Sequence, residues 1–224
     1  MRVRLIAKDF LTYGCLALQG KAVALFLLLA GPTWSEEFTV LALGDSLTQG
    51  YGLVEEEGFV PQLQSWLDGQ GADVVLINGG VSGDTTAGGA ARADWSLTPE
   101  VDAMILALGA NDMLRGIDPA ISRANLAKIL QVASGKNIKV LLVGFRAPGN
   151  YGPEFKVEFD AIYPDLAAQF GVGHAEDFFA GLVGVTPEDW QVFFQPDGIH
   201  PNAEGVARIV ANLGPAVLRL VPEE

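Results

Sequence analysis

The chain has 224 residues, of which 50% are hydrophobic and 18% charged, and its mean hydropathy is +0.29. This length predicts one domain, or at most two small ones, and the composition excludes an intrinsically disordered chain. The formal net charge of −13 at pH 7 argues against nucleic acid as a partner, because an acidic surface repels phosphate backbones. Anionic membrane surfaces are disfavoured for the same reason.

Residues 1–35 differ in composition from the rest of the chain. They contain four basic residues and one acidic residue: Arg2, Arg4, Lys8, Lys21 and Asp9. The apolar run AVALFLLLA at 22–30 fits the core of a secretory signal, about 7–15 residues, and is short for a spanning helix of about 20. We therefore expect residues 1–35 to be a signal peptide cleaved after Ser35, with an uncleaved N-terminal anchor as the alternative. The long basic lead-in also leaves open a later translation start.

Removal of this leader would leave 10 basic and 26 acidic residues in 36–224, a net charge of 10 − 26 = −16. The single Cys15 lies in the leader, so the mature chain would have no thiol for a disulfide, a zinc–thiolate site or a cysteine nucleophile. The expected location is the periplasm or the extracellular medium.

Short apolar runs alternate with helical patterns along 36–224. Strands are expected at 38–44, 73–79, 102–109 and 138–144, with a weaker one around 172–179. Helices are expected at 58–70, 119–135, 155–170 and 202–220. Because the strands are apolar almost throughout, they suit a parallel sheet that is covered on both faces. The alternation predicts an open, doubly wound α/β sheet in one domain.

The stretch 119–135 carries the clearest helix signals. Asp118 is a good N-cap residue, Pro119 suits the first helical position, and Gly135 suits the end. Its expected apolar face consists of Ile121, Leu126, Ile129, Leu130 and Val132.

Four loops rich in small and polar residues follow predicted strands or lie near the C-terminus. They are Gly-Asp-Ser-Leu at 44–47 and the segments 78–89, 109–116 and 195–205. In doubly wound sheets, ligands bind beyond the carboxyl ends of the strands. We therefore expect these loops to converge at one edge of the sheet.

The chain contains the groups that acyl transfer requires: a nucleophile, a base, a group that orients the base, and donors for the oxyanion. His200 has Asp197 three residues before it, close enough for the carboxylate to bind Nδ1–H and leave Nε2 to face a serine. His174 lacks such a neighbour, so we expect a hydrogen-bonded structural histidine.

Ser46 is the best candidate nucleophile, because a serine at a strand-to-helix turn lies near the positive end of a helix dipole. The alternative role for Ser46 is that of a helix cap, and Ser82 is a rival nucleophile. Asn111 could donate its side-chain amide to an oxyanion, and Gly83 its backbone N–H. Both could instead be turn residues.

Taken in order, Gly-Asp-Ser-Leu at 44–47, Gly83, Gly-x-Asn-Asp at 109–112 and Asp-x-x-His at 197–200 resemble the GDSL, or SGNH, hydrolases. The resemblance runs from about residue 38 to the end. Longer stretches such as GDSLTQGYGL and DGIHPNAEG are similar to the bacterial arylesterases, acyl-CoA thioesterase I and lysophospholipase L1.

This resemblance implies a flavodoxin-like three-layer α/β/α sandwich with a central, mostly parallel five-stranded sheet. It implies a triad of Ser46, Asp197 and His200, and an oxyanion hole made by the N–H groups of Ser46 and Gly83 and the side chain of Asn111. It implies no metal and no cofactor.

The implied activity is that of a serine esterase that hydrolyses carboxylic esters or thioesters of small molecules or lipids. Residues 145–155 either wall the acyl site or are only a connecting loop. Two alternatives on the same fold stay open: a carbohydrate O-deacetylase, and a non-catalytic lipid- or glycan-binding module. A metalloenzyme that used Asp197 and His200 as ligands would need a third ligand, which the sequence does not identify.

Overall fold

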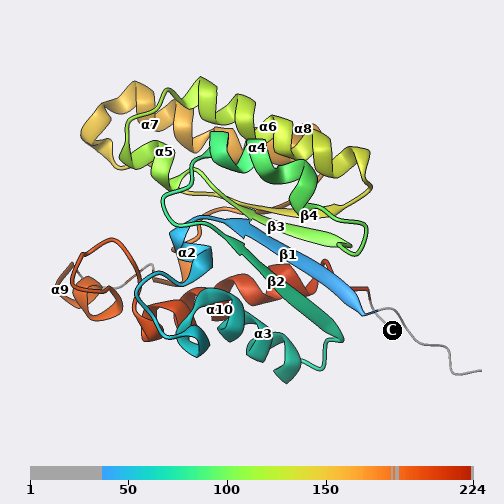
Figure 1. Ribbon diagram of the computed structural model, residues 1–224. Coiled ribbons are helices and arrows are strands. Elements are labelled where there is room, and N and C mark those ends of the chain that lie inside the picture. Colours follow the sequence, from blue (N-terminus) through green and yellow to red (C-terminus); the bar gives the residue numbers. More distant parts are fainter. Residues whose placement is uncertain (1–36, 183, 185–186, 223–224) are drawn as a thin grey trace, which may run out of the picture. The chain divides into compact units, whose positions relative to one another are not determined.

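The computed structural model describes residues 37–182, 184 and 187–222. The expected leader, with Cys15, lies outside the described residues. A parallel five-stranded sheet with the order β2-β1-β3-β4-β5 occupies the centre of the described part (Figure 1). Its strands are β1 (Phe38–Gly44), β2 (Val74–Gly80), β3 (Ala103–Ala107), β4 (Lys139–Val143) and β5 (Gly173–Ala175).

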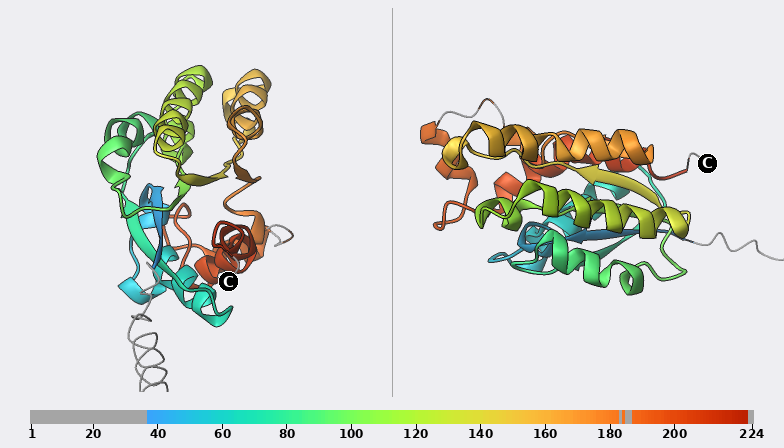
Figure 2. Two further views of the ribbon diagram at one scale, coloured as in Figure 1. Left: turned by 90° about the vertical axis from the view of Figure 1, so that its right-hand side faces the viewer. Right: turned by 90° about the horizontal axis from the view of Figure 1, so that it is seen from above.

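Helices cover both faces of this sheet. One face carries α4 (Thr86–Ser96), α6 (Pro119–Gly135), α7 (Pro153–Asp160) and α8 (Ile162–Phe170), and the other carries α3 (Phe59–Gly69) and α10 (Ala203–Leu218) (Figures 1 and 2). The short helices are α2 (Ser46–Gln49), α5 (Ala110–Leu114), α9 (Pro187–Trp190), η1 (Glu55–Glu57), η2 (Gly149–Tyr151), η3 (Ala180–Leu182) and η4 (Gln191–Phe193). The central strands are buried, as their apolar sequences require. The predicted three-layer α/β/α fold is confirmed.

The strand order puts the predicted site loops side by side. The chain runs from β1 outward to β2 and then returns to form β3 on the opposite side of β1. Gly44, the last residue of β1, pairs with Gly80 of β2 and with Ala107 of β3. The loops after these three strands therefore begin at the same level. They lie at the topological switch point, where the chain changes from adding strands on one side of β1 to adding them on the other. Ligands of doubly wound sheets bind at such a point.

The helix predicted at 119–135 forms with the expected start. The carboxylate of Asp118 accepts a hydrogen bond from the N–H of Ala120 at 2.8 Å, and Pro119 is the first helical residue. The apolar face is partly wrong: Ile121 is 53% exposed, whereas Ser122 is fully buried. The polar Ser122 is buried because its hydroxyl donates to the buried carboxylate of Asp112.

Other elements differ from the prediction. Helix α4 was not predicted, because its sequence TAGGAARADWS is rich in glycine and has few large apolar residues. These small residues are needed for packing: a Cβ on buried Gly89 would collide with the side chain of Leu108. The single helix expected at 155–170 is two helices, α7 and α8, which Ala161 separates. Strand β5 has only three residues.

Candidate active site

Three side chains that are far apart in the sequence, one near residue 46 and two near residue 200, form one chain of hydrogen bonds. The hydroxyl Oγ of Ser46 lies 2.8 Å from Nε2 of His200. The other ring nitrogen, Nδ1, lies 2.6 Å from Oδ2 of Asp197. Hydroxyl, imidazole and carboxylate thus have the relative arrangement of a Ser-His-Asp triad. Ser82, the rival nucleophile, is exposed.

A closed loop holds Asp197 and His200 in this position. Phe194 and Pro201 form an antiparallel bridge at its base, and the N–H of Gln195 donates to the carbonyl of His200 at 2.8 Å. The side-chain amide of Gln195 donates to the carbonyl of Tyr51, at 2.8 Å, and so ties this loop to the segment after α2. The ring of Tyr51 lies against that of His200, with 4.6 Å between centroids.

The carboxylate of Asp197 is held in its ionised form. The backbone N–H of His200, its side chain and the N–H of Ile199 all donate to it, and they lower the pKa of Asp197 to about 2. A carboxylate in this position can fix the imidazole tautomer and stabilise the imidazolium that forms when His200 accepts a proton.

Ser46 is the first residue of α2 and only 7% exposed. Its N–H, like every N–H in the first turn of a helix, has no acceptor within its own helix. The preceding Asp45 caps α2 by accepting the N–H of Leu47 at 3.0 Å. Gly44 allows this tight connection, because a Cβ there would collide with the side chain of Thr48. The capping role considered for Ser46 thus falls to Asp45.

Gly83 is part of a tight turn after β2. The N–H of Asp84 donates to the carbonyl of Val81 at 3.0 Å, so Gly83 occupies the third of four turn positions. Its φ of +77° is what a type II turn requires there, and glycine adopts it without strain. The guanidinium of Arg115 donates to the Gly83 carbonyl at 2.8 Å.

Asn111, on α5, is connected to both of these loops. Its Nδ2 donates to Oδ2 of Asp45 at 3.1 Å, and its Oδ1 accepts a long hydrogen bond from Arg115 at 3.5 Å. These partners fix the amide so that its N–H groups lie on the Asp45 side.

Burial raises the pKa of Asp45 to about 6, although the N–H of Leu47, the Asn111 amide and the nearby His200 act to lower this pKa.

Comparison with known proteins identifies the family to which the chain belongs. Residues 42–208 match the GDSL-like Lipase/Acylhydrolase family. The chain belongs to this family. It is therefore an enzyme of the hydrolase class, and the family predicted from the four sequence motifs is confirmed.

Three relatives span most of this hydrolase. Esterase TesA of Pseudomonas aeruginosa is 39% identical over 184 residues, which cover 82% of this chain and 89% of TesA. The arylesterase of Vibrio mimicus is 36% identical over 85% of this chain and 94% of its own. Thioesterase 1/protease 1/lysophospholipase L1 of Escherichia coli K12 is 36% identical over 74% of this chain and 76% of its own. The crystal structure of TesA superposes with a TM-score of 0.74 at 38% identity, covering 82% of this chain and 99% of that one.

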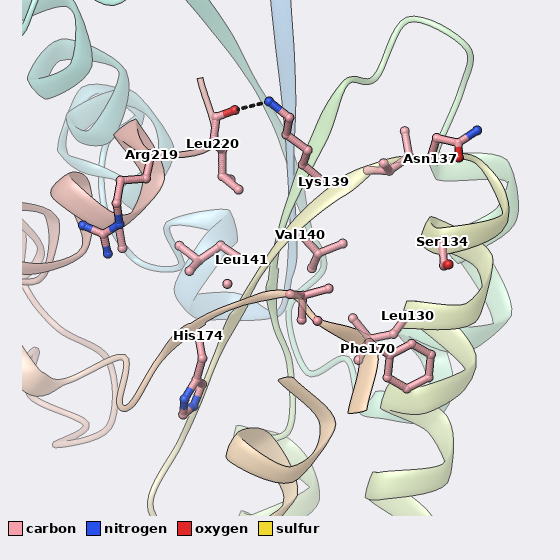
Figure 3. A pocket seen from close by; sticks show the side chains of 15 residues that line it. Leu130, Ser134, Asn137, Lys139, Val140, Leu141, Phe170, His174, Arg219 and Leu220 are labelled. Atoms are coloured by element: carbon pink, nitrogen blue, oxygen red, sulfur yellow. Dashed lines mark hydrogen bonds between the residues drawn. The ribbon is translucent and has the colours of Figure 1, made fainter. Parts of the chain in front are cut away.

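A cavity of about 510 Å³ lies away from this constellation, beside the amino ends of β4 and β5. Figure 3 shows that its polar side chains diverge: Asn137, His174 and Arg219 point in different directions. The amino group of Lys139 is turned to the carbonyl of Leu220, 3.2 Å away. No polar groups converge in this cavity, whereas Asp197, His200 and Ser46 form a chain of hydrogen bonds beyond the carboxyl ends of the strands.

His174 differs from its predicted role. Its Nε2 is buried and has no hydrogen-bond partner among the described residues, so the expectation of a hydrogen-bonded structural histidine is wrong for this nitrogen. Burial is the main cause of its lowered pKa. No group of three or more His, Cys, Asp or Glu side chains in the described ranges is arranged to hold a metal ion.

Three residues near the proposed site were not predicted: Asp45, Arg92 and Arg115. Asp45 stands inside the Gly-Asp-Ser-Leu motif, but its side chain was given no role. Arg92 and Arg115 are two of only 14 basic residues in an acidic chain. Arg92 lies within about ten residues of Gly83, and Arg115 lies within about ten residues of Asn111. This closeness in sequence could have indicated that they support the proposed site.

Proposed function

We propose that this hydrolase is a serine esterase that cleaves carboxylic esters or thioesters, with Ser46 as the nucleophile. The observation that carries the proposal is the hydrogen-bond chain Asp197–His200–Ser46, at 2.6 and 2.8 Å. A base within this distance of a hydroxyl can remove its proton during attack.

The proposed reaction has two halves. His200 Nε2 takes the proton of Ser46 as Oγ bonds to the carbonyl carbon, and the carbonyl electrons move onto oxygen. When the tetrahedral intermediate collapses, the bond to the alcohol or thiol breaks and that group receives the proton from His200. Water then attacks the acyl–Ser46 ester with His200 again as base, and releases the acid and free Ser46.

The proposed oxyanion hole consists of the N–H groups of Ser46 and Gly83 and the amide of Asn111. The hydrogen bonds from Asn111 to Asp45 and from Arg115 to the Gly83 carbonyl support it, because they hold these donors without using the second hydrogen of Asn111 Nδ2. Removal of one such donor typically costs about 3–4 kcal/mol in the barrier.

Four exposed apolar residues that lie close in sequence to the proposed site residues form a proposed apolar rim, which supports apolar acyl or aryl substrates: Tyr51, Val81, Leu114 and Ile199. Each of these residues is about half exposed, between 47% and 51%. Each lies within five residues of a proposed site residue. Exposed apolar side chains that gather around a site favour a hydrocarbon ligand over a sugar.

The segment 145–155, expected either to wall the acyl site or merely to connect two elements, contacts this rim. The hydroxyl of Tyr151 donates to the carbonyl of Leu114 at 3.0 Å. We therefore favour its role as a wall of the acyl site. The segment is not a loop throughout: η2 spans Gly149–Tyr151, and α7 begins at Pro153.

The proposed substrates are aryl esters, short to medium acyl esters and lysophospholipids, and the names of the three relatives support this range. We further propose that residues 1–35 are a signal peptide, that 36–224 form the hydrolase domain, and that the enzyme acts in the periplasm or outside the cell. None of the described helices is both long and apolar enough to cross a membrane. In an exported enzyme, cytoplasmic acyl-CoA would not be the natural substrate.

A panel of p-nitrophenyl esters with acyl chains of two to sixteen carbons tests the proposal, with acetylated xylan and a lysophospholipid alongside. We expect turnover of the aryl and lipid esters, and its loss in Ser46→Ala. Turnover of acetylated xylan alone would identify an O-deacetylase instead. Activity that survives in Ser46→Ala would refute Ser46 as the nucleophile.

A further inference from the structure

Resting on the proposed function, we infer that Arg92 is a positioning residue that sets the Gly83 oxyanion donor relative to the Ser46 nucleophile. Arg92 lies on α4, and its guanidinium reaches back to the carboxyl edge of the sheet. Its Nε donates to Oδ2 of Asp84 at 2.8 Å, one terminal nitrogen donates to the carbonyl of Gly79 at 2.8 Å, and the other donates to the carbonyl of Gly44 at 2.9 Å.

Each of the three partners belongs to a different part of the proposed site. Gly44 ends β1, two residues before Ser46. Gly79 lies at the end of β2, where the chain leaves the sheet toward the Gly83 turn. Asp84 is the last residue of that turn. One rigid, planar group therefore sets the spacing between the strand that delivers the nucleophile and the turn that delivers the oxyanion donor.

The surroundings of Arg92 leave its guanidinium and its partners little freedom to move. The side chains of Arg92 and Asp84 are each only 11% exposed, so little water can replace a lost hydrogen bond. Asp84 is itself fixed, because its Oδ1 accepts the N–H of Thr85 at 3.0 Å. The Gly44 carbonyl also accepts the N–H of Val81, at 3.1 Å, so β1 holds the beginning of the turn while Arg92 holds its end.

Lysine cannot replace arginine in this role. The guanidinium presents donors in a fixed plane that matches three acceptors at once, whereas an ammonium is a single point on a flexible chain. Arg92 does not touch the reacting atoms, so its removal should displace the Gly83 N–H without altering His200. A displacement of about 1 Å in a catalytic group can cost about 10²-fold in rate.

The experiment compares wild type, Arg92→Lys, Arg92→Met and Asp84→Asn in p-nitrophenyl ester hydrolysis. Exhaustive labelling with a fluorophosphonate counts the competent sites in each preparation, so that kcat is expressed per labelled site. The matched control is Arg123→Met, which removes an arginine that is paired with Asp165 at 2.9 Å on the surface. Thermal unfolding is recorded for every variant.

We expect kcat per labelled site to fall about 10- to 100-fold in both Arg92 variants and less in Asp84→Asn, with KM within about threefold and an unchanged pH dependence. The control should match wild type. If the Arg92 variants do not fold, kcat per labelled site in Asp84→Asn tests the inference: a fall supports it, and the wild-type value refutes it. If the variants only lose thermal stability or labelled fraction, while kcat per labelled site stays at the wild-type value, Arg92 merely stabilises the fold and the inference is wrong. Absence of esterase activity in the wild type would instead refute the proposed function.

Discussion

Asn111 Nδ2 donates a 3.1 Å hydrogen bond to Oδ2 of Asp45, which joins the helix after β3 to the cap of the helix that begins with Ser46. An ionised carboxylate only accepts hydrogen bonds, so this contact requires the nitrogen of the amide, not its oxygen, to face Asp45. The buried acid thereby defines which way the proposed oxyanion donor points.

Replacement of Asn111 by alanine removes one oxyanion donor. We expect kcat to fall about 10²- to 10³-fold with little change in KM, because the donor acts on charge that develops only in the transition state. Steady-state kinetics on a p-nitrophenyl ester measure both constants. Asn212→Ala, at an exposed position on α10, is the control. A rise in KM alone would show that Asn111 binds the substrate and does not stabilise the oxyanion.

The buried carboxyl of Asp45 should make stability depend on pH. Burial raises its pKa from 3.8 to about 6, so between these values the folded protein holds a proton that the unfolded chain has released. Stability must then fall as pH rises through this window, by about 3 kcal/mol from this group.

Asp45→Asn removes this titration. The free energy of unfolding of the variant minus that of wild type should therefore increase by about 2–3 kcal/mol between pH 4 and pH 7. Urea denaturation at intervals of one pH unit gives this difference. A difference that does not change with pH would show that Asp45 is not buried as described.

Asp197→Asn tests the orienting role of the carboxylate. The variant can keep a similar shape, but its amide favours the wrong imidazole tautomer, and we expect kcat/KM to fall about 10³- to 10⁴-fold. Because its pKa is lowered to about 2, wild-type Asp197 stays ionised at every practical assay pH. Asp165→Asn, at an exposed ion pair with Arg123, should retain wild-type kinetics. A loss below tenfold would argue against a triad.

Gly83→Ala introduces strain without a clash. The nearest atom to an added Cβ is a nitrogen of Arg115 at 3.6 Å, but φ is +77°. We expect a loss of about 1–2 kcal/mol in stability, and a lower kcat as the turn shifts. Gly69→Ala is a sharp control, because it lies in α3 with open space around its Cβ, and alanine there should stabilise by up to about 1 kcal/mol. Equal effects in the two variants would contradict the turn geometry.

Much of the fold and of the proposed site could be predicted from the sequence, because these features depend on local sequence patterns. The apolar run at 38–44 is β1 residue for residue, and the start of α6 follows from Asp118 and Pro119. His200 and Asp197 were recognisable because one of only two histidines stands three residues after an aspartate. Ser46 was recognisable because it follows an apolar strand at the predicted turn into a helix. The structure places their side chains within hydrogen-bond distance.

What could not be predicted depends on contacts between distant residues. Helix α4 has weak helical propensity and is recognisable only through the close packing of Gly89 on Leu108. The role of Arg92 requires knowledge that its guanidinium reaches Gly44, 48 residues away. Ile121 is exposed and Ser122 is buried, where its hydroxyl donates to the carboxylate of Asp112, a contact that the helical pattern does not reveal.

Covalent labelling distinguishes Ser46 from every other candidate nucleophile of this hydrolase. Wild type and Ser46→Ala are incubated with a fluorophosphonate, and intact mass and peptide mapping identify the modified residue. We expect one adduct per chain, on Ser46, and none in Ser46→Ala. An adduct on another residue, or an unmodified wild type that still hydrolyses esters, would show that Ser46 is not the nucleophile.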